Sequence, residues 1–193
     1  TPAKLQTQVA EKLTVATGQP AYEPWVVDDN PANGKGFESA VAYAVAKQLG
    51  YSPEQVSWTR TTFDGAVAPG PKDFDWNLQQ YSITPQREQA VDFSAPYYTV
   101  TQAVVTTKGS PIAGATTLAE LKNAKLGAAV GTTSLDDANT VIAPTKAVSV
   151  FNDNAAAVTA LKNGQVDGIV VDLPTAFYLT SAELDNGVIV GQL

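Results

Sequence analysis

The chain of 193 residues has a net charge of −7, with 44% hydrophobic and 16% charged residues, and it contains no cysteine, histidine or methionine. This composition excludes disulfides, thiol nucleophiles, serine–histidine–aspartate catalysis and the common zinc sites, and the acidic balance disfavours nucleic acid or an anionic membrane surface as a partner. No stretch approaches the roughly 18 consecutive apolar residues of a membrane span, and the length suits one large domain or two small lobes.

The first half of the chain alternates strands with helices. In chain order the pattern predicts a polar lead-in over 1–12, a strand over 13–17, a helix over 37–49, a strand over 56–60, a short helix over 63–67 and a strand over 74–78. One face of helix 37–49 is expected to pack on the core through Phe37, Val41, Ala44, Val45 and Leu49. Gly50 is expected to end this helix.

The second half repeats the alternation. The predicted elements are a strand over 101–107, a short helix over 118–121, a strand over 125–129, a helix over 134–142, a strand over 147–151, a helix over 154–162, a strand over 166–171, a helix over 174–182 and a strand over 188–190. This order favours parallel α/β sheets. The 101–107 run is interpreted as a crossover, which divides the chain into lobe 1 (1–100) and lobe 2 (101–193).

A hydroxyl pair and an arginine follow strand 74–78. Ser82 lies in the loop, and Thr84-Pro85 is typical of an N-cap followed by proline at the first helical position, so a short helix with Arg87 in its first turn is expected. A guanidinium fork beside hydroxyl donors at the carboxyl end of a strand suits a carboxylate ligand. A surface ion pair of Arg87 with a neighbouring acid is the alternative.

Gly131-Thr132-Thr133-Ser134 connects a strand to a helix. Backbone N–H groups and hydroxyls at a helix N-terminus bind anions, but the spacing and the missing lysine of a P-loop disfavour nucleotide phosphate. An anion site and plain N-capping both stay open.

Asp172 stands at the carboxyl end of the last long apolar run, directly before Leu173-Pro174. This position is typical of an N-cap, but its carboxylate could also bind a ligand ammonium. Ligands of open α/β sheets bind at the carboxyl ends of strands. Asp172 together with Arg87 would therefore form a receptor for a zwitterion.

Three aromatic residues, Tyr22, Trp25 and Phe63, lie in or near loops that follow strands, where they could wall an apolar slot. Trp25 is interpreted as a core residue.

Together these stretches resemble the extracytoplasmic amino-acid-binding proteins of ABC importers, the family 3 solute-binding proteins. The resemblance covers nearly the whole chain, through residues 15–18, 21–25, 36–38, 63–64, 127–133 and 167–172 and, most specifically, through 82–87 (Ser-Ile-Thr-Pro-Gln-Arg) and 91–98 (Val-Asp-Phe-Ser-Ala-Pro-Tyr-Tyr).

The resemblance implies a two-lobed α/β fold, the type II or Venus-flytrap fold of periplasmic binding proteins, with a ligand cleft between lobes that closes on a free amino acid. By the family pattern Arg87 holds the α-carboxylate with help from the N–H groups of Thr132 and Thr133, Asp172 takes the α-amino group, Ser82 and the loop at Gln80 assist, and Tyr22 and Phe63 flank the side chain.

The resemblance also implies a protein without catalysis, cofactor or metal. It implies a monomer outside the cytoplasm, in the periplasm or at the cell surface, that delivers its ligand to a membrane permease. A lipid anchor ahead of Thr1 stays open.

The sequence departs from the family pattern at the ligand side chain and at the C-terminus. Gly18-Gln19 stands where binders of basic amino acids often carry an acid, and bulky Gln79-Gln80 replaces small residues. Both departures favour a polar uncharged or acidic ligand side chain. Family members continue past the position of Leu193 and return to lobe 1, so the chain is expected to be truncated, either as a fragment or as a naturally short form.

Two other functions stay open. One is an enzyme similar to cyclohexadienyl dehydratases on the same scaffold, with Glu23 or Asp28 as a neutral general acid. The other is the ligand-sensing domain of a receptor. A paired-carboxylate hydrolase is disfavoured, because three further acids are typical of turn caps and solvated faces: Asp64, Glu88 and Asp92.

Overall fold

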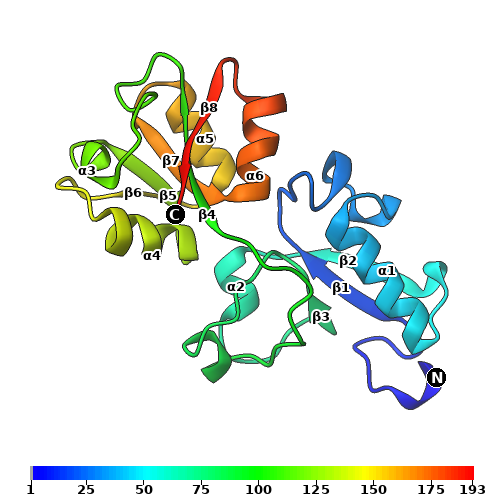
Figure 1. Ribbon diagram of the computed structural model, residues 1–193. Helices are drawn as coiled ribbons and strands as arrows, with labels where there is room; N and C mark the ends of the chain where they lie inside the picture. Colours follow the sequence, from blue (N-terminus) through cyan, green and yellow to red (C-terminus); the bar gives the residue numbers. More distant parts are fainter. Residues whose placement is uncertain (1) are drawn as a thin grey trace. The chain divides into compact units, whose positions relative to one another are not determined.

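The computed structural model describes residues 2–193. These residues form two compact units, of which the first ends at Pro96 and the second covers Tyr97–Leu193 (Figure 1). Each unit has a sheet and helices of its own.

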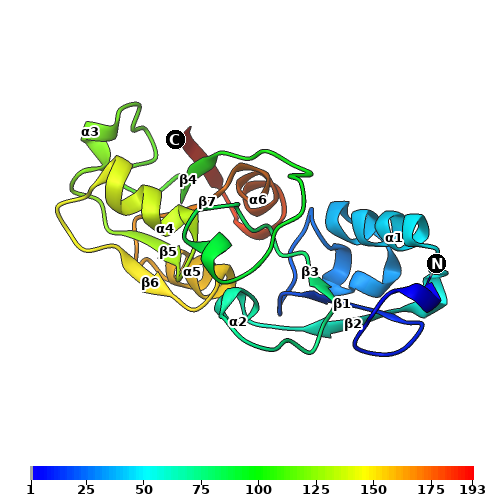
Figure 2. The same cartoon turned by 90° about the horizontal axis from the view of Figure 1, so that it is seen from below.

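The first unit is built on a three-stranded parallel sheet in the order β2-β1-β3. Its regular elements are β1 (Leu13–Thr17), α1 (Phe37–Leu49), β2 (Val56–Arg60), α2 (Phe63–Val67) and β3 (Trp76–Asn77). Short 3-10 turns lie at Pro2–Lys4, Val27–Asp29, Pro31–Asn33, Pro53–Gln55 and Arg87–Gln89. Figure 2 shows α1 running beside the sheet. The predicted strands at 13–17 and 56–60 are confirmed, and the strand expected over 74–78 is reduced to two residues.

Helix α1 has the predicted limits but not the predicted face. Its buried residues are Glu38, Ser39, Ala42 and Ala46, whereas Phe37 and Leu49 are 39% and 38% exposed. The expected apolar face is therefore wrong at both of its ends, whereas Val41 packs against the core as predicted. The buried positions Glu38, Ala42 and Ala46 are four residues apart. An acid and two alanines do not form an apolar pattern that sequence periodicity would detect.

Two glycines fix the ends of α1. Gly50 adopts the left-handed conformation (φ 90°), and its N–H donates to the carbonyls of Ala46 and Lys47, which confirms the predicted stop. Gly36 precedes the helix with φ 95°, and a Cβ there would come within 2.4 Å of the Trp25 carbonyl oxygen. Only glycine allows the chain to pass this close to the Trp25 backbone.

The second unit holds a five-stranded sheet in the order β6-β5-β7-β4-β8. Its elements are β4 (Gln102–Thr107), α3 (Leu118–Leu121), β5 (Leu126–Ala129), α4 (Thr133–Asp137, extended by a π-helical turn over Ala138–Ile142), β6 (Ser149–Phe151), α5 (Asn154–Lys162), β7 (Gly168–Asp172), α6 (Leu173–Tyr178, extended by a π-helical turn over Leu179–Glu183) and β8 (Gly187–Gln192).

Strand direction in this sheet is mixed. Strand β5 runs parallel to β6 and β7, as the alternation of strands and helices predicts, but β4 pairs antiparallel with both β7 and β8. The expectation of purely parallel sheets is therefore wrong for the second unit. Strand β4 comes directly from the first unit without a crossover helix, so nothing in the chain forces it to be parallel to its neighbours.

The second unit has three layers, with helices on both faces of the sheet (Figure 1). On one face Val105, Ile169 and Val171 pack against α5 and α6, and on the other face Val104 and Val170 pack against residues of α3, α4 and its π-helical turn. Successive residues of a strand point to opposite faces, and burial on both faces explains the continuous apolar runs of β4 and β7.

Candidate ligand-binding site

Arg87 follows β3 on a short capped turn. The Thr84 Oγ1 accepts a hydrogen bond from the Arg87 N–H (3.2 Å), and the Thr84 carbonyl accepts from the Glu88 N–H (3.0 Å). Thr84 therefore caps this turn, as expected. The helix predicted after Pro85 is shorter than expected, because only the 3-10 turn at Arg87–Gln89 forms.

The guanidinium of Arg87 lies over two aromatic rings. Its Cζ is 5.3 Å from the ring centroid of Phe63 and 5.6 Å from that of Tyr81, and its Nη1 donates to the Ser82 carbonyl at 2.7 Å. Cation–π contacts and the hydrogen bond restrict the orientation of the side chain. We call Phe63, Tyr81, Ser82 and Arg87 the Arg87 cluster.

Tyr81 and Phe63 form the base of the Arg87 cluster. Their ring centroids are 4.3 Å apart, and the Tyr81 hydroxyl donates to the Phe63 carbonyl at 2.6 Å. Burial raises the pKa of Tyr81 above its ordinary value, against the opposing effect of the Arg87 guanidinium. The phenol therefore keeps its proton at neutral pH and remains a donor. Phe63 was predicted to flank a ligand side chain, and the structure places its ring beneath Arg87.

Gln80 is held in an unusual backbone conformation by a buried acid. Its φ is 53°, in the left-handed region that non-glycine residues rarely adopt. Glu38, only 1% exposed in the first turn of α1, accepts from the Gln80 N–H through Oε1 (2.8 Å) and from Nε2 through Oε2. The helix N-terminus also favours this carboxylate. No local pattern predicts this pair, because its two members are 42 residues apart in the chain.

Glu38→Ala is expected to destabilise the first unit by about 1–3 kcal/mol, because the part-buried N–H of Gln80 loses its acceptor. Glu38→Gln keeps an oxygen for this N–H and should lose less. All three tryptophans, Trp25, Trp58 and Trp76, lie in the first unit, so denaturant unfolding followed by tryptophan fluorescence measures the effect there. Equal losses in both variants would contradict the role given to the hydrogen bond.

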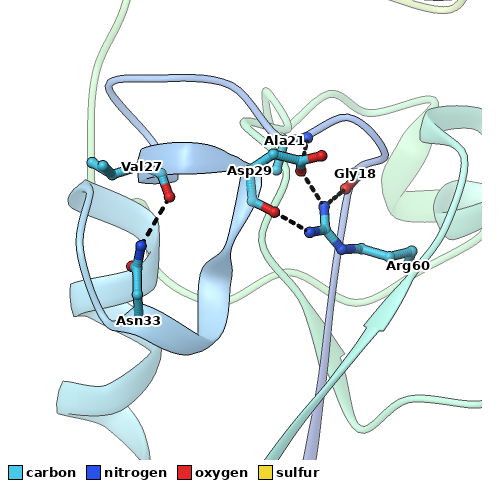
Figure 3. A network of polar contacts seen from close by, with 6 residues as sticks. All are labelled: Gly18, Ala21, Val27, Asp29, Asn33 and Arg60. Atoms are coloured by element: carbon cyan, nitrogen blue, oxygen red, sulfur yellow. Dashed lines mark hydrogen bonds and ion pairs between the residues drawn. The ribbon is translucent and has the colours of Figure 1, made fainter.

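A second network anchors the loop that carries Tyr22 (Figure 3). Arg60, the last residue of β2, forms an ion pair with Asp29 (Nη1 to Oδ1, 2.6 Å) and donates to the Gly18 carbonyl at 2.6 Å. The same Asp29 oxygen accepts from the Ala21 N–H at 2.8 Å. Arg60 thus connects the first residue and the middle of the loop between β1 and α1 to β2, through Gly18 and Asp29. Tyr22 lies in this loop, half-buried in the turn that precedes Trp25.

Thr132 and Thr133 open α4 in the second unit. The Thr132 hydroxyl caps the helix by accepting from the Leu135 N–H at 3.2 Å, and it donates to the Ala129 carbonyl at 2.7 Å. The capping interpretation is therefore correct for the Thr132 side chain. Of the backbone N–H groups at this helix N-terminus, the Thr132 hydroxyl accepts a hydrogen bond from that of Leu135.

Asp172 ends β7 opposite Gln102, the first residue of β4. Gln102 Nε2 donates to Asp172 Oδ1 (2.8 Å) and to Thr133 Oγ1 (3.3 Å), and the Ser134 hydroxyl donates to Gln102 Oε1 (2.5 Å). Within residues 2–193 the Asp172 side chain makes no capping hydrogen bond to α6, although Asp172 occupies the N-cap position. We call Gln102, Thr133, Ser134 and Asp172 the Asp172 cluster.

The structure thus brings the candidate residues together in two groups, one in each unit. The Arg87 cluster contains a cation, which follows β3, and the Asp172 cluster contains an anion, which is the last residue of β7. Sequence reasoning missed Tyr81, Glu38 and Gln102. Trp25 is only 3% exposed, which confirms its interpretation as a core residue.

The described part of the chain, residues 2–193, has no group of three or more acidic, histidine or cysteine side chains placed to bind a metal ion. It also has no helix long and apolar enough to span a membrane. Four acids considered for catalysis are exposed: Asp28, Asp64, Glu88 and Asp92. The clusters are suited to binding charged groups through fixed donors and acceptors.

Comparison with known proteins gives one family. The model of the bacterial extracellular solute-binding proteins, family 3, matches residues 13–141, which include the Arg87 cluster and the start of the Asp172 cluster.

Three relatives bind amino acids according to their names. A probable histidine-binding protein of Campylobacter jejuni is 30% identical over 85% of this chain and 62% of its own length. An ABC transporter glutamine-binding protein of Bacillus subtilis is 31% identical over 74% of this chain and 52% of its own length. An L-cystine-binding protein of Escherichia coli is 27% identical over 97% of this chain and 70% of its own length. The chain thus spans 52–70% of the length of these relatives.

Solved structures agree with the family match. An ancestral arginine-binding protein bound to glutamine has a TM-score of 0.79 and 32% identity over 94% of this chain and 79% of its own. Holo ArgBP from T. maritima has a TM-score of 0.78 and 28% identity over 94% and 78%. An ancestral amino-acid-binding protein described as a precursor of cyclohexadienyl dehydratase has a TM-score of 0.78 and 31% identity over 94% and 78%.

Proposed function

Because this chain belongs to family 3 of the bacterial extracellular solute-binding proteins, we propose that it binds a free amino acid outside the cytoplasm for delivery to an ABC importer. Its α/β fold with two sheets is the two-lobed type II fold of periplasmic amino-acid-binding proteins. The observation that carries the proposal is the pair of opposite charges, each held by neighbouring side chains, in the Arg87 and Asp172 clusters.

Each cluster suits one end of a zwitterion. We assign the α-carboxylate to the guanidinium of Arg87, whose planar fork matches a carboxylate, with the N–H groups of Thr132 and Thr133 as further donors. We assign the α-ammonium to Asp172. A ligand that contacts both clusters stabilises the arrangement of the two units in which both contacts form, and the permease would recognise that arrangement.

Four residues are assigned supporting or side-chain contacts. Ser82 and Gln80 belong to the loop that presents Arg87, and the Gln80 backbone is fixed by Glu38. Tyr22, on the loop anchored by Arg60, is assigned to the ligand side chain. Phe63 supports Arg87 with its ring and is assigned, with Tyr22, to flank the ligand side chain.

We propose that the ligand side chain is polar and uncharged, or acidic. Gly18-Gln19 offers no acid at the end of β1, and the nearby Asp29 already holds Arg60 and the Ala21 N–H. A basic side chain that recruited Asp29 would have to draw this acid away from Arg60, at a cost in free energy.

The test is thermal unfolding of the chain in the presence of each common amino acid. A ligand at about 100 times its Kd adds roughly 2.7 kcal/mol, which should raise the midpoint by about 5–10 °C. Glutamine, asparagine, serine, glutamate and aspartate are expected to include the ligand. A chain stabilised by none of the amino acids would refute amino-acid binding, and one stabilised only by arginine or lysine would refute the proposed side-chain preference.

A dehydratase is the second candidate, supported by the similarity to the ancestral precursor protein. It requires a neutral general acid near the bound substrate. Of the acids considered for this role, Asp28 is exposed and Glu23 is half-buried, which leaves Glu23 as the candidate. Release of water and carbon dioxide from a cyclohexadienyl carboxylate, lost in Glu23→Gln, would favour the enzyme.

A further inference from the structure

A buried amide connects the candidate ligand groups of the second unit. Gln102 is 5% exposed, and Ser134, its hydrogen-bond partner, is 6% exposed. The Gln102 backbone is paired with Asp172 in the antiparallel β4–β7 ladder, so its side chain starts beside that residue. A polar group buried to this degree is costly unless its hydrogen bonds are made.

The hydrogen bonds of this amide have one consistent direction. Oε1 accepts from the Ser134 hydroxyl at 2.5 Å, and Nε2 donates to Asp172 Oδ1 at 2.8 Å and to Thr133 Oγ1 at 3.3 Å. Rotating the amide by half a turn would bring Oε1 against the Asp172 carboxylate, acceptor against acceptor. The Asp172 carboxylate, which can only accept, therefore selects the orientation in which Gln102 directs its N–H donors to Asp172 and Thr133, and the Ser134 hydroxyl supplies the donor for Oε1.

We propose that Gln102 is a positioning residue for ligand binding: it sets the orientation of the Asp172 carboxylate and of the Thr133 hydroxyl from one buried amide. The inference rests on the proposed function, in which Asp172 takes the ligand ammonium. A neutral donor suits this task. A lysine or arginine would cancel the charge that the ammonium needs, and a carboxylate would repel Asp172.

The test compares Gln102→Glu with Gln192→Glu, which makes the same change at an exposed residue of the adjacent strand β8. The affinity for the amino acid identified by the unfolding panel is measured by calorimetry from about pH 5 to about pH 8. At the upper pH the introduced carboxylate cannot donate, and Gln102→Glu should bind roughly 10-fold more weakly or worse.

The affinity of Gln102→Glu should recover as the pH falls. Burial beside Asp172 raises the pKa of the introduced carboxyl, and once protonated this group again donates to Asp172. Wild type and Gln192→Glu should show no such recovery. Wild-type affinity in Gln102→Glu at the upper pH would overturn the proposal, and so would an affinity loss that is the same at every pH, since that is the result of a structural defect.

A second measurement does not need a ligand. Gln102→Met removes the amide at similar volume, and the pKa of the Asp172 carboxyl, followed by carbon-13 NMR, should rise because the ionised form loses a donor. An unchanged pKa would overturn the positioning role even if Gln102→Glu does not fold. A wild-type chain that binds no amino acid refutes the proposed function, whereas a binding wild type with unaffected Gln102 variants refutes only this inference.

Discussion

Arg87→Ala should remove the thermal stabilisation that the amino-acid ligand gives to the wild-type chain. Truncating one partner of a hydrogen-bonded charge pair costs about 2–5 kcal/mol of binding free energy. The Kd should therefore rise roughly 30-fold or more. Calorimetric titration of the ligand into both proteins measures the change, and the wild-type ligand concentrations should then leave the unfolding midpoint of the variant almost unmoved.

Two further variants separate the guanidinium from its charge. Arg87→Lys keeps the charge but loses the planar fork, so its affinity should fall between those of wild type and Arg87→Ala. Lys47→Ala removes one positive charge from the exposed end of α1 and should bind as the wild type does.

The choice of ligand gives Arg87 a sharper test. The decarboxylated amine of the same amino acid lacks the group assigned to Arg87, so it should bind wild type weakly and lose little more in Arg87→Ala. An amine that loses as much affinity as the parent amino acid would show that Arg87 does not contact the carboxylate.

Asp172→Asn should weaken binding by a similar amount, about 2–5 kcal/mol, because the ligand ammonium would lose its counter-charge. The substitution keeps the shape of the side chain and an oxygen that can accept from Gln102 Nε2. The second unit should therefore remain folded, as circular dichroism and the thermal midpoint without ligand will report.

The control for Asp172→Asn is the same change at Asp185, an exposed acid of the second unit, which should leave affinity unchanged. The deaminated analogue of the ligand provides the matching comparison, because it lacks the group assigned to Asp172. It should not distinguish wild type from Asp172→Asn. A preference for wild type as strong as that of the parent amino acid would exclude the ammonium contact.

The elements that sequence reasoning predicted well are those with local signals. Helix α1 begins after Gly36 and ends at Gly50, and both residues adopt positive φ values that glycine allows. Strands β1 and β2 are apolar or alternating runs bounded by turn residues. The turn at Arg87 was visible through Thr84-Pro85, although proline at the first position fixes only the start of a helix and not its length.

The failures have nonlocal causes. Glu38 lies on the buried side of α1 because its partner is the backbone N–H of Gln80. The sequence of the helix alone does not predict that partner. The direction of β4 is equally hidden, since a continuous β-branched run has the same appearance in parallel and antiparallel pairing. The role of Gln102 is not predictable from the sequence, because a single polar residue at the start of an apolar run is typical of an ordinary strand end.

The Arg87 and Asp172 clusters also differ in the sequence separation of their members. Arg87 and Phe63 are close in sequence, but Gln102 and Asp172 are separated by 70 residues and meet only when β7 has inserted between β5 and β4. During synthesis the apolar strand β4 leaves the ribosome long before this partner, and closing so large a loop is slow. Until then β4 remains available to chaperones and to aggregation. The proposed ligand contact of Asp172 would consequently require that β7 has already joined β5 to β4.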